Sequence, residues 1–459
     1  NATYDAGWLR AEGIEVKGTI IDTMVAAPLV NENRFSYSLN NLGRDYIDMR
    51  KDEKMLRAAA KDFGIDPKSE MWRLPPKFVG PYAEQDALMT LKLWDRLRIE
   101  IDMQELNTVF GLETKLIPIL LDMRTKGVRV DLDKAEQAKQ TLKARIVKLK
   151  KFIKDKTSVD IEPWANASVE SVFKALNLNY PKTELGAPSF TKQFLLAHPH
   201  EVAQAIVKLR EADKADSTFI DSILKHEYKG RIHCEFHQLR SDDGGTVTGR
   251  FSSSNPNLQQ IPARDPEIKK LIRGLFIPEE GQKWGSFDYS SQEPRLLVHY
   301  CSVLGRHDRH PMIDEVIEEY HKGDADFHQM VADLAGISRK EAKTVNLGIM
   351  YGMGVAKLGA QLSLSTEEAK SLMTKYHERV PFVKLLADRV MQRAADNGKI
   401  RTIAGRLCRF DLWEPKTFGY NKPMKHEDAE REYGPQIRRA FTYKALNKLI
   451  QGSAADQTK

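Results

Sequence analysis

Apolar residues recur at helical spacing in several long segments of the chain and form short runs in others. The spacing predicts helices at residues 39–63 with a loop between two of them, 82–97, 113–126, 134–156 and 366–376. Two shorter apolar runs, 18–24 and 284–288, each predict a buried strand. Gly127 is expected to end the helix at 113–126, and a short strand is expected to follow it.

Two serine and glutamate pairs predict where helices begin. Ser338 with Glu341, and Ser365 with Glu368, have the three-residue spacing of a capping box. Each pair can satisfy the free amides of a first helical turn, so both predict a helix start.

The segment 134–156 has an unusual charge pattern. Leu142, Ile146, Leu149 and Ile153 are spaced to face one side of a helix. The same segment has nine basic and two acidic side chains, an excess that equals the net charge of +7 of the whole chain. A solvated helix face and a contact with nucleic-acid phosphates both explain this pattern, and both readings stay open at this stage.

Composition restricts the class of protein. A chain of 459 residues with 41% hydrophobic content can form two to four globular domains. It contains no run of eighteen apolar residues and opens with no leader, so we expect a soluble protein without a membrane span or signal peptide. Cys234, Cys301 and Cys408 are too scattered for a disulfide framework or a zinc cluster, which fits a reducing compartment.

Two stretches contain candidate chemistry. Asp288 ends an apolar run and precedes a hydroxyl-rich turn, an arrangement that can hold a divalent metal over a phosphate. Farther along, Arg339, Lys343, Leu347 and Tyr351 are four residues apart and therefore share one helix face. With two cations at one end and an aromatic ring at the other, that face suits a nucleoside triphosphate.

These stretches resemble two motifs of a known family. Asp-Tyr-Ser-x-x-Glu-x-Arg, beginning at Asp288, and Arg-x3-Lys-x7-Tyr-Gly, beginning at Arg339, are similar to motifs A and B of family A DNA polymerases. The resemblance extends over nearly all of the chain and points to the bacteriophage members of the DNA polymerase I group. It implies template-directed DNA synthesis with an associated 3′-5′ proofreading exonuclease domain.

The resemblance also implies a fold. The expected class is α/β and α+β multidomain, with a ribonuclease H-like 3′-5′ exonuclease domain followed by a right-hand polymerase of thumb, palm and fingers. The implied domains are 1–105 (exonuclease-like), 106–230 (start of the polymerase and thumb), 231–300 (palm), 301–445 (fingers, with an insertion at 409–435) and 446–459 (return to the palm).

The family assigns roles to residues of motif A. Asp288 and the Tyr289 carbonyl would bind two Mg²⁺ ions, with Mn²⁺ as the alternative ion. Glu293 would occupy the space that a ribose 2′ hydroxyl needs, which favours deoxynucleotides. Arg295 is expected to support the site through an ion pair.

The nucleotide is expected to lie against motif B. His328, Arg339 and Lys343 would hold the triphosphate, and Lys343 is placed to protonate the departing pyrophosphate. Tyr351 would stack near the templating base. Leu347 departs from the Phe or Tyr that many relatives have, and a branched aliphatic side chain cannot stack on the sugar as a ring does. We therefore expect altered sugar discrimination and speed.

The resemblance also implies the residues that contact DNA. Arg250 would read minor-groove acceptors that all correct base pairs share. The other expected contacts, to the backbone and the primer-template, are Asn257, Gln259, Arg264, Asn447, Gln451, Lys148 and Lys151.

Two short motifs near the start resemble exonuclease motifs. Asp5, in Asn-x-x-Tyr-Asp, and Asp86, in Tyr-x3-Asp, would bind metal ions, and Tyr82 would orient the attacking water. The family's first exonuclease motif is expected before residue 1 and its motif C after residue 459. The sequence is thus expected to be a fragment.

Two alternatives remain at this stage. The chain could be a catalytically incomplete binder of primer-template and nucleotide. A single-subunit RNA polymerase shares the Arg-x3-Lys pattern, but Glu293 and the exonuclease-like region argue against it. The expected partners are primer-template DNA, deoxynucleoside triphosphates and replisome proteins such as a processivity factor, helicase or primase, in the host cytoplasm if the source is viral.

Overall fold

The computed structural model divides the chain into two compact units, each made of separate segments. It describes residues 1–183, 185–262, 265–305, 309–323, 325–362, 364–417, 419 and 421–459. Unit 1 comprises Asn1–Leu121, His237–Phe251 and Phe287–Lys459, and unit 2 comprises Asp122–Phe236 and Ser252–Ser286.

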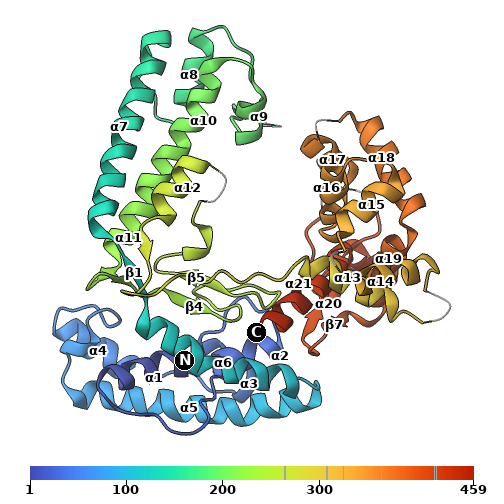
Figure 1. Cartoon of the computed structure of the whole chain (residues 1–459). Coiled ribbons are helices and arrows are strands. Elements are labelled where there is room, and N and C mark those ends of the chain that lie inside the picture. Colours follow the sequence, from blue (N-terminus) through green and yellow to red (C-terminus); the bar gives the residue numbers. More distant parts are fainter. Residues whose placement is uncertain are drawn as a thin grey trace. The chain divides into compact units, whose positions relative to one another are not determined.

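The first segment of unit 1 is helical. Its helices are α1 (Ala2–Ala11), α2 (Thr23–Val30), α3 (Leu39–Ile47), α4 (Lys54–Asp62), α5 (Pro76–Met103) and α6 (Asn107–Lys126). The long α5 lies along α2 and α3, as Figure 1 shows in blue. A core of buried residues from α2, α3, α5 and α6 also includes Leu239 and Leu407, so distant parts of the sequence complete it.

The helix-loop-helix prediction for 39–63 is confirmed by α3 and α4, but the strand predicted at 18–24 is wrong. Residues 18–22 form no strand, and α2 begins at Thr23. The Asp22 carboxylate accepts a hydrogen bond of 2.8 Å from the Met24 amide, which makes Asp22 a helix N-cap. Only the end of this short apolar run, from the cap Asp22 onward, belongs to a helix start, an ambiguity that periodicity alone does not resolve.

The leucines of α5 divide into two groups by burial. Leu93 and Leu97 are fully buried, whereas Leu88 and Leu91 are exposed. The helix continues six residues beyond the predicted end, and Ile101 adds another buried turn.

The last segment of unit 1 contains helices and short antiparallel strands. Its elements are α13 (Gln292–Ser302), α14 (Met312–His321), α15 (Phe327–Ala335), α16 (Arg339–Met350), α17 (Val355–Leu362), α18 (Thr366–Arg379), α19 (Pro381–Asn397), β7 (Lys399–Arg401), β8 (Leu407–Arg409), β9 (Trp413–Pro415), α20 (His426–Tyr433), β10 (Ile437–Arg439) and α21 (Ala445–Thr458). β7 pairs with β8 and β9 with β10, all antiparallel.

One large core joins α13 to α19 and α21, with Phe327, Tyr376 and Phe382 almost fully buried in it. Both predicted capping boxes are confirmed, because the Ser338 and Ser365 side chains and the Glu341 and Glu368 side chains cap α16 and α18 reciprocally. The first turn of each helix is therefore determined by residues next to it in sequence.

Unit 2 combines helices with a small antiparallel sheet. Its elements are β1 (Val128–Val130), α7 (Leu132–Thr157), α8 (Asn166–Ala175), α9 (Lys192–Ala197), α10 (Glu201–Lys214), α11 (Asp221–Lys225), β2 (Glu227–Tyr228), β3 (Arg231–Ile232), β4 (Glu235–His237), β5 (Ser252–Ser254), α12 (Pro266–Arg273) and β6 (Phe276–Ile277). The four-stranded sheet has the order β2-β3-β1-β6, and β4 pairs with β5. Gly127, at φ +62°, separates α6 from β1 as predicted.

The basic segment forms α7, which lies beside α10 (Figure 1). Leu142 and Ile153 are fully buried, and Ile146 and Leu149 pack against the same cores. The predicted inner face of this helix is confirmed, so its lysines occupy the other faces.

The strand predicted at 284–288 is wrong. The structure has no regular element between β6 and α13, and Trp284, Phe287 and Tyr289 are exposed, Phe287 at 97%. A strand needs a partner for its backbone groups, and none of the described strands pairs with this run.

Candidate functional site

Glu293 is the centre of a group of polar side chains in unit 1. It lies in the first turn of α13, after Ser291, which has φ +52°. One carboxylate oxygen pairs with the Arg250 guanidinium, and the other accepts a hydrogen bond of 2.8 Å from the Tyr351 hydroxyl. The Glu293 side chain is only 14% exposed, so the pair is partly protected from water.

Tyr351 joins this group to α21. Burial is the largest effect that raises the pKa of Tyr351, and Glu293 adds to it, while a hydrogen bond with Gln451 acts in the opposite direction. The structure therefore brings together four residues that the sequence singled out separately: Arg250, Glu293, Tyr351 and Gln451. Asn447 lies one turn before Gln451 on α21, and both are half-buried.

The predicted cationic end of α16 is exposed. Arg339 forms two bonds to the Asp326 carboxylate, 2.7 Å from Nη2 and 2.8 Å from Nε, and Asp326 also caps α15. Lys343 is exposed and forms no ion pair with a described residue. Leu347, one turn farther, is half-buried and packs against the large core of unit 1.

His328 is held in a buried polar network. Its Nδ1 lies 3.0 Å from Asn346 Nδ2, and Asn346 Oδ1 accepts a bond of 2.6 Å from the Tyr376 hydroxyl. Burial lowers the pKa of His328, and the nearby Lys343 and Arg339 act in the same direction. The ring is therefore neutral at pH 7. Asn346 and Tyr376 were not predicted, because nothing in their local sequence indicates that they meet.

Motif A has no regular structure around its acid. Asp288 and Tyr289 are exposed. The ion pair predicted for Arg295 is wrong: Nε donates to the Ser290 carbonyl at 3.0 Å, and the guanidinium lies 4.9 Å from the centre of the Tyr320 ring. A backbone acceptor and an aromatic face together replace the expected carboxylate.

The predicted DNA contacts of unit 2 differ in their surroundings. Asn257 caps a short 3₁₀ turn, since its side chain accepts a hydrogen bond from the Gln259 amide at 3.1 Å. Gln259 is exposed, and Arg264 lies outside the described residues. Lys148 and Lys151 are exposed on α7 and form no ion pair with described residues.

Most other cations of α7 are paired. Lys139, Arg145, Lys150, Lys154 and Lys156 each lie within 3.2 Å of a carboxylate of unit 2. Much of the charge of this helix is thus compensated within unit 2, which leaves Lys148 and Lys151 as its freest predicted contacts.

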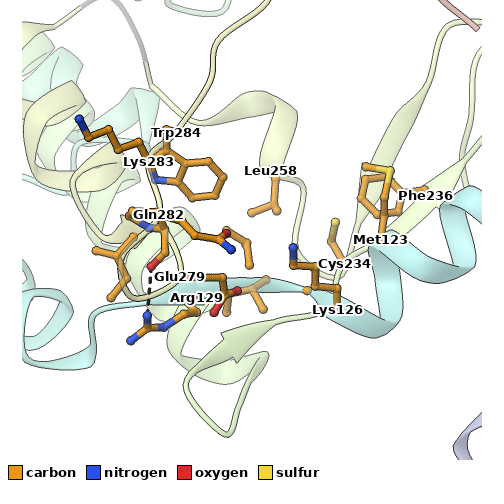
Figure 2. A pocket seen from close by; sticks show the side chains of 15 residues that line it. Met123, Lys126, Arg129, Cys234, Phe236, Leu258, Glu279, Gln282, Lys283 and Trp284 are labelled. Atoms are coloured by element: carbon orange, nitrogen blue, oxygen red, sulfur yellow. Dashed lines mark hydrogen bonds between the residues drawn. The ribbon is translucent and has the colours of Figure 1, made fainter.

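Unit 2 also contains a cavity of about 290 Å³, shown in Figure 2. Its walls are mostly apolar and include Met123, Phe236, Leu258 and Trp284. Arg129 borders it and donates a hydrogen bond of 3.1 Å to the Pro278 carbonyl, drawn as a dashed line. None of the residues predicted to contact substrate lines this cavity.

The predicted exonuclease residues are partly brought together. Lys51 Nζ lies 2.6 Å from Asp86 Oδ2 and 3.1 Å from the Tyr82 hydroxyl. Burial acts to lower the pKa of Lys51, but its bonds to Asp86 and Tyr82 raise it overall. Asp5 is exposed on α1, and no described contact joins it to Asp86. Lys51 was not predicted.

The predicted metal ligands do not make a complete site by themselves. Among the described residues, no group of three or more His, Cys, Asp or Glu side chains is placed to hold a metal ion. Neither Asp288 nor Asp86 belongs to such a group of described residues. A two-metal site needs more acidic ligands than one carboxylate.

A buried ionic cluster in unit 1 was also missed. Glu113 and Asp456 both pair with Arg406, at 2.6 and 2.8 Å, and Glu113 also binds Lys459 at 2.8 Å. All four side chains are at most 3% exposed. Burial lowers the pKa of Lys459 to about 8, although Glu113 acts in the opposite direction, so Lys459 is still charged at pH 7.

The three cysteines are buried and free, as expected. Across the part of the chain that the structure describes, every helix is too short or too polar to cross a membrane.

Comparison with known proteins shows two matching families. Residues 132–459 match the model of DNA polymerase family A, and residues 1–102 match that of a 3′-5′ exonuclease. A DNA-directed DNA polymerase of Pseudomonas phage M6 is 36% identical over 509 residues, which cover 100% of this chain and 73% of the relative. The DNA polymerase DpoZ of Acinetobacter phage SH-Ab 15497 is 29% identical over 511 residues, which cover 100% and 76%.

A solved structure agrees with these relatives. The polymerase domain of Pol1 from M. smegmatis, in complex with DNA primer-template and dNTP, aligns with a TM-score of 0.74 at 26% identity, over 98% of this chain and 71% of that chain. Because the polymerase model matches most of the sequence, the resemblance found in motifs A and B is confirmed at the level of the family. The chain therefore belongs to DNA polymerase family A, as a DNA-directed DNA polymerase with a 3′-5′ exonuclease domain.

Proposed function

We propose that this chain binds a primer-template and adds deoxynucleotides to the primer 3′ hydroxyl, with Arg250, Glu293 and Tyr351 at the growing end. The observation that supports this most directly is Glu293, which joins Arg250 on one side and Tyr351 on the other. A guanidinium, a carboxylate and an aromatic ring at one point can contact a base-pair edge, exclude a 2′ hydroxyl and cover a base.

In this proposal α16 binds the triphosphate. Lys343 is exposed and free to contact phosphates, whereas Arg339 has to exchange its Asp326 partner for the nucleotide. His328 is held neutral and nearly buried, so it contributes a hydrogen bond rather than a positive charge. Lys343 donates the proton that the departing pyrophosphate takes. Leu347 lies between these groups and Tyr351 on the helix.

Each unit contains proposed nucleic-acid contacts. Asn447 and Gln451 on α21 face the primer-template in unit 1, and Lys148 and Lys151 on α7 neutralise backbone phosphates in unit 2. Gln259 and Arg264 are further backbone contacts, while Asn257 acts mainly by shaping the turn that presents Gln259. The proposed domains keep the boundaries 1–105, 106–230, 231–300, 301–445 and 446–459.

Family A polymerases and their exonuclease domains generally use divalent metals. We propose Mg²⁺, with Mn²⁺ as the alternative, held by Asp288 and the Tyr289 carbonyl in the polymerase and by Asp5 and Asp86 in the exonuclease. These residues alone do not fit a full two-metal site, because the described residues gather too few acidic ligands. At the exonuclease site Lys51 occupies the bonding position beside Asp86 that a cation would take.

The partners that we propose are primer-template DNA and deoxynucleoside triphosphates, because the M. smegmatis polymerase domain is in complex with a DNA primer-template and dNTP. A processivity factor, helicase or primase would act with the chain in a replisome, in the cytoplasm of the host of a phage.

The test is primer extension by this chain on a labelled primer-template with Mg²⁺, with deoxy- and ribonucleotides in parallel. Extension with deoxynucleotides is the expected result, and the Asp288→Asn variant should abolish it. Binding of DNA and nucleotide without extension would instead identify the chain as a catalytically incomplete binder. Preferential extension with ribonucleotides would favour an RNA polymerase.

A further inference from the structure

The buried ionic cluster of Glu113, Arg406, Asp456 and Lys459 lies directly under the loop that contains Arg250. Arg406 Nη2 binds the carboxylates of both Glu113 and Asp456, and the Asp456 carboxylate also accepts hydrogen bonds from the Thr402 hydroxyl and the Ala404 amide. Gln238 donates to the Glu113 carboxylate at 2.9 Å and to its carbonyl at 2.8 Å. Two carboxylates and two cations thus compensate each other out of contact with water.

Such a cluster is rigid for a physical reason. Removing one partner would leave a buried charge unpaired, which is far more costly than the pair is worth on balance. Burial acts to lower the pKa of Arg406, but attraction to Glu113 and Asp456 raises it overall. Arg406 is therefore fixed in position as well as in charge.

Gly249 packs against the fixed guanidinium. It has φ +81°, and a methyl group placed on it would lie 2.7 Å from Arg406 Cζ and 2.8 Å from Arg406 Nε. That is closer than two non-bonded heavy atoms can approach, so only glycine allows the loop to lie this near. Arg406 Nη1 is buried, makes no hydrogen bond with described residues and lies on the same side.

Phe251, on the other side of Arg250, rests on the second cation. Lys459 Nζ lies 4.6 Å from the centre of the Phe251 ring, and Glu113 holds that ammonium group in place. The Arg250 carbonyl also accepts a hydrogen bond of 2.9 Å from the Thr246 hydroxyl. Gly249 therefore contacts Arg406 and Phe251 contacts Lys459, and Glu113 binds both of these cations.

We infer that this ionic cluster positions Arg250: it fixes the backbone on both sides of Arg250 and thereby sets where the guanidinium meets Glu293 and the primer terminus. Glu113, Arg406 and Asp456 are positioning residues in this scheme and touch no substrate. The inference rests on the proposed role of Arg250 at the primer end. It gives a functional reason for four buried charged side chains, which protein cores usually lack.

The experiment substitutes the glycine and leaves the charges in place. Gly249→Ala pushes a methyl group against Arg406, so the loop has to move away from the cluster. Gly434→Ala is the matched control, because Gly434 also has a left-handed φ, +73°, yet a methyl group there meets nothing within 4 Å. Both variants place an alanine at a positive φ and so bear a backbone cost, and only Gly249→Ala disturbs the contact with Arg406.

The measurement is the equilibrium binding of labelled primer-template with a matched or a mismatched primer end, by fluorescence anisotropy, without nucleotide. Contacts to the minor groove distinguish these two ends. In Gly249→Ala we expect the preference for the matched end to fall about tenfold, a loss of about 1.4 kcal/mol, and to approach that of Arg250→Ala. Gly434→Ala should keep the preference of the unaltered chain.

A second variant tests the cluster itself. Arg406→Lys shortens the group under Gly249 and keeps the charge, so it makes room for the methyl group. The double variant of Gly249→Ala with Arg406→Lys should lose less of the preference for the matched end than the sum of the losses in the two single variants. Such non-additive effects are typical of residues in contact. Thermal melting of each variant checks that it is folded.

Several results would overturn the inference. These are equal preference in Gly249→Ala and Gly434→Ala, strictly additive losses in the double variant, or no preference in the unaltered chain. A chain that distinguishes matched from mismatched ends but does not extend them would contradict the proposed catalytic function and leave the positioning role intact, since binding and chemistry are read separately.

Discussion

The Tyr351 hydroxyl donates a hydrogen bond of 2.8 Å to Glu293 Oε2 and so connects the end of α16 to the start of α13. Arg250 occupies the other carboxylate oxygen. Glu293 is thereby held from two sides before any nucleotide binds, and a side chain held in this way can exclude a substrate by shape.

Replacing Glu293 should weaken the rejection of ribonucleotides. Glu293→Ala removes the carboxylate and leaves room for a 2′ hydroxyl, and we expect the ratio of ribo- to deoxynucleotide incorporation to rise by at least about tenfold, as a changed specificity pocket allows. Tyr351→Phe keeps the ring and loses only the hydrogen bond, so its effect should be smaller. Single-nucleotide extension assays measure both ratios, and an unchanged ratio in Glu293→Ala would exclude the proposed role.

Leu347 should limit how tightly the sugar is held. Leu347→Phe supplies a ring that can stack, a gain of about 0.5–1.5 kcal/mol, so KM for deoxynucleotides should fall up to about tenfold and the use of dideoxynucleotides should change with it. Leu347→Met is the control, since it has similar volume without a ring. Equal dideoxynucleotide incorporation by the Leu347→Phe variant and the unaltered chain would contradict the prediction.

Local features of the fold were predictable from the sequence. The capping boxes at Ser338 and Ser365 depend on residues three positions apart, and both formed as expected. The inner face of α7 followed from helical spacing alone, because burial of Leu142 and Ile153 repeats with the helix period.

Features that depend on distant partners were not predictable in this way. Lys51 meets Asp86 across 35 positions and Arg406 meets Glu113 across 293, with no local pattern that marks either pair. The strand predicted at 284–288 is wrong for the same reason, because a strand needs a pairing partner and the sequence of these five residues does not specify one. The family resemblance identified Arg250 and Glu293 separately, and only the structure shows them bound to each other.

His328 should make the stability of unit 1 depend on pH. Burial lowers its pKa in the folded chain, so the unfolded chain, with a pKa of about 6.5, binds more protons in mildly acid solution. Stability is then full above about pH 6.5 and decreases as pH falls below it. Protonation also removes the acceptor that faces Asn346. The groups around the ring are Asp326, which opposes this shift, and Lys343 and Arg339, which add to it.

The measurement is the melting temperature between about pH 5.5 and 7.5, which is about one unit either side of an ordinary His pKa. His328→Gln should melt with a flatter dependence on pH than the unaltered chain, although not a flat one, because burial also lowers the pKa of His377. His426→Gln, which removes an imidazole at an exposed position, is the control variant. The same dependence in all three proteins would mean that His328 titrates alike in the folded and unfolded chain.

The free lysines of α7 should determine part of the salt dependence of DNA binding. Lys148 and Lys151 are exposed and unpaired among the described residues, whereas Lys154 lies 2.8 Å from Asp160. Each phosphate that a lysine neutralises releases counterions and contributes about 0.9 to the slope of log K against log salt concentration.

The double variant Lys148→Gln with Lys151→Gln should therefore reduce the magnitude of that slope by nearly 2 (about 0.9 for each contact) and weaken binding to the same extent on all DNA sequences. Lys154→Gln is the control: it also removes one positive charge, but Asp160 already compensates that charge. The slope for this variant should therefore change less. If the double variant and Lys154→Gln gave the same slope as the unaltered chain, the phosphates would lie elsewhere, and the charge of α7 would serve only its ion pairs within unit 2.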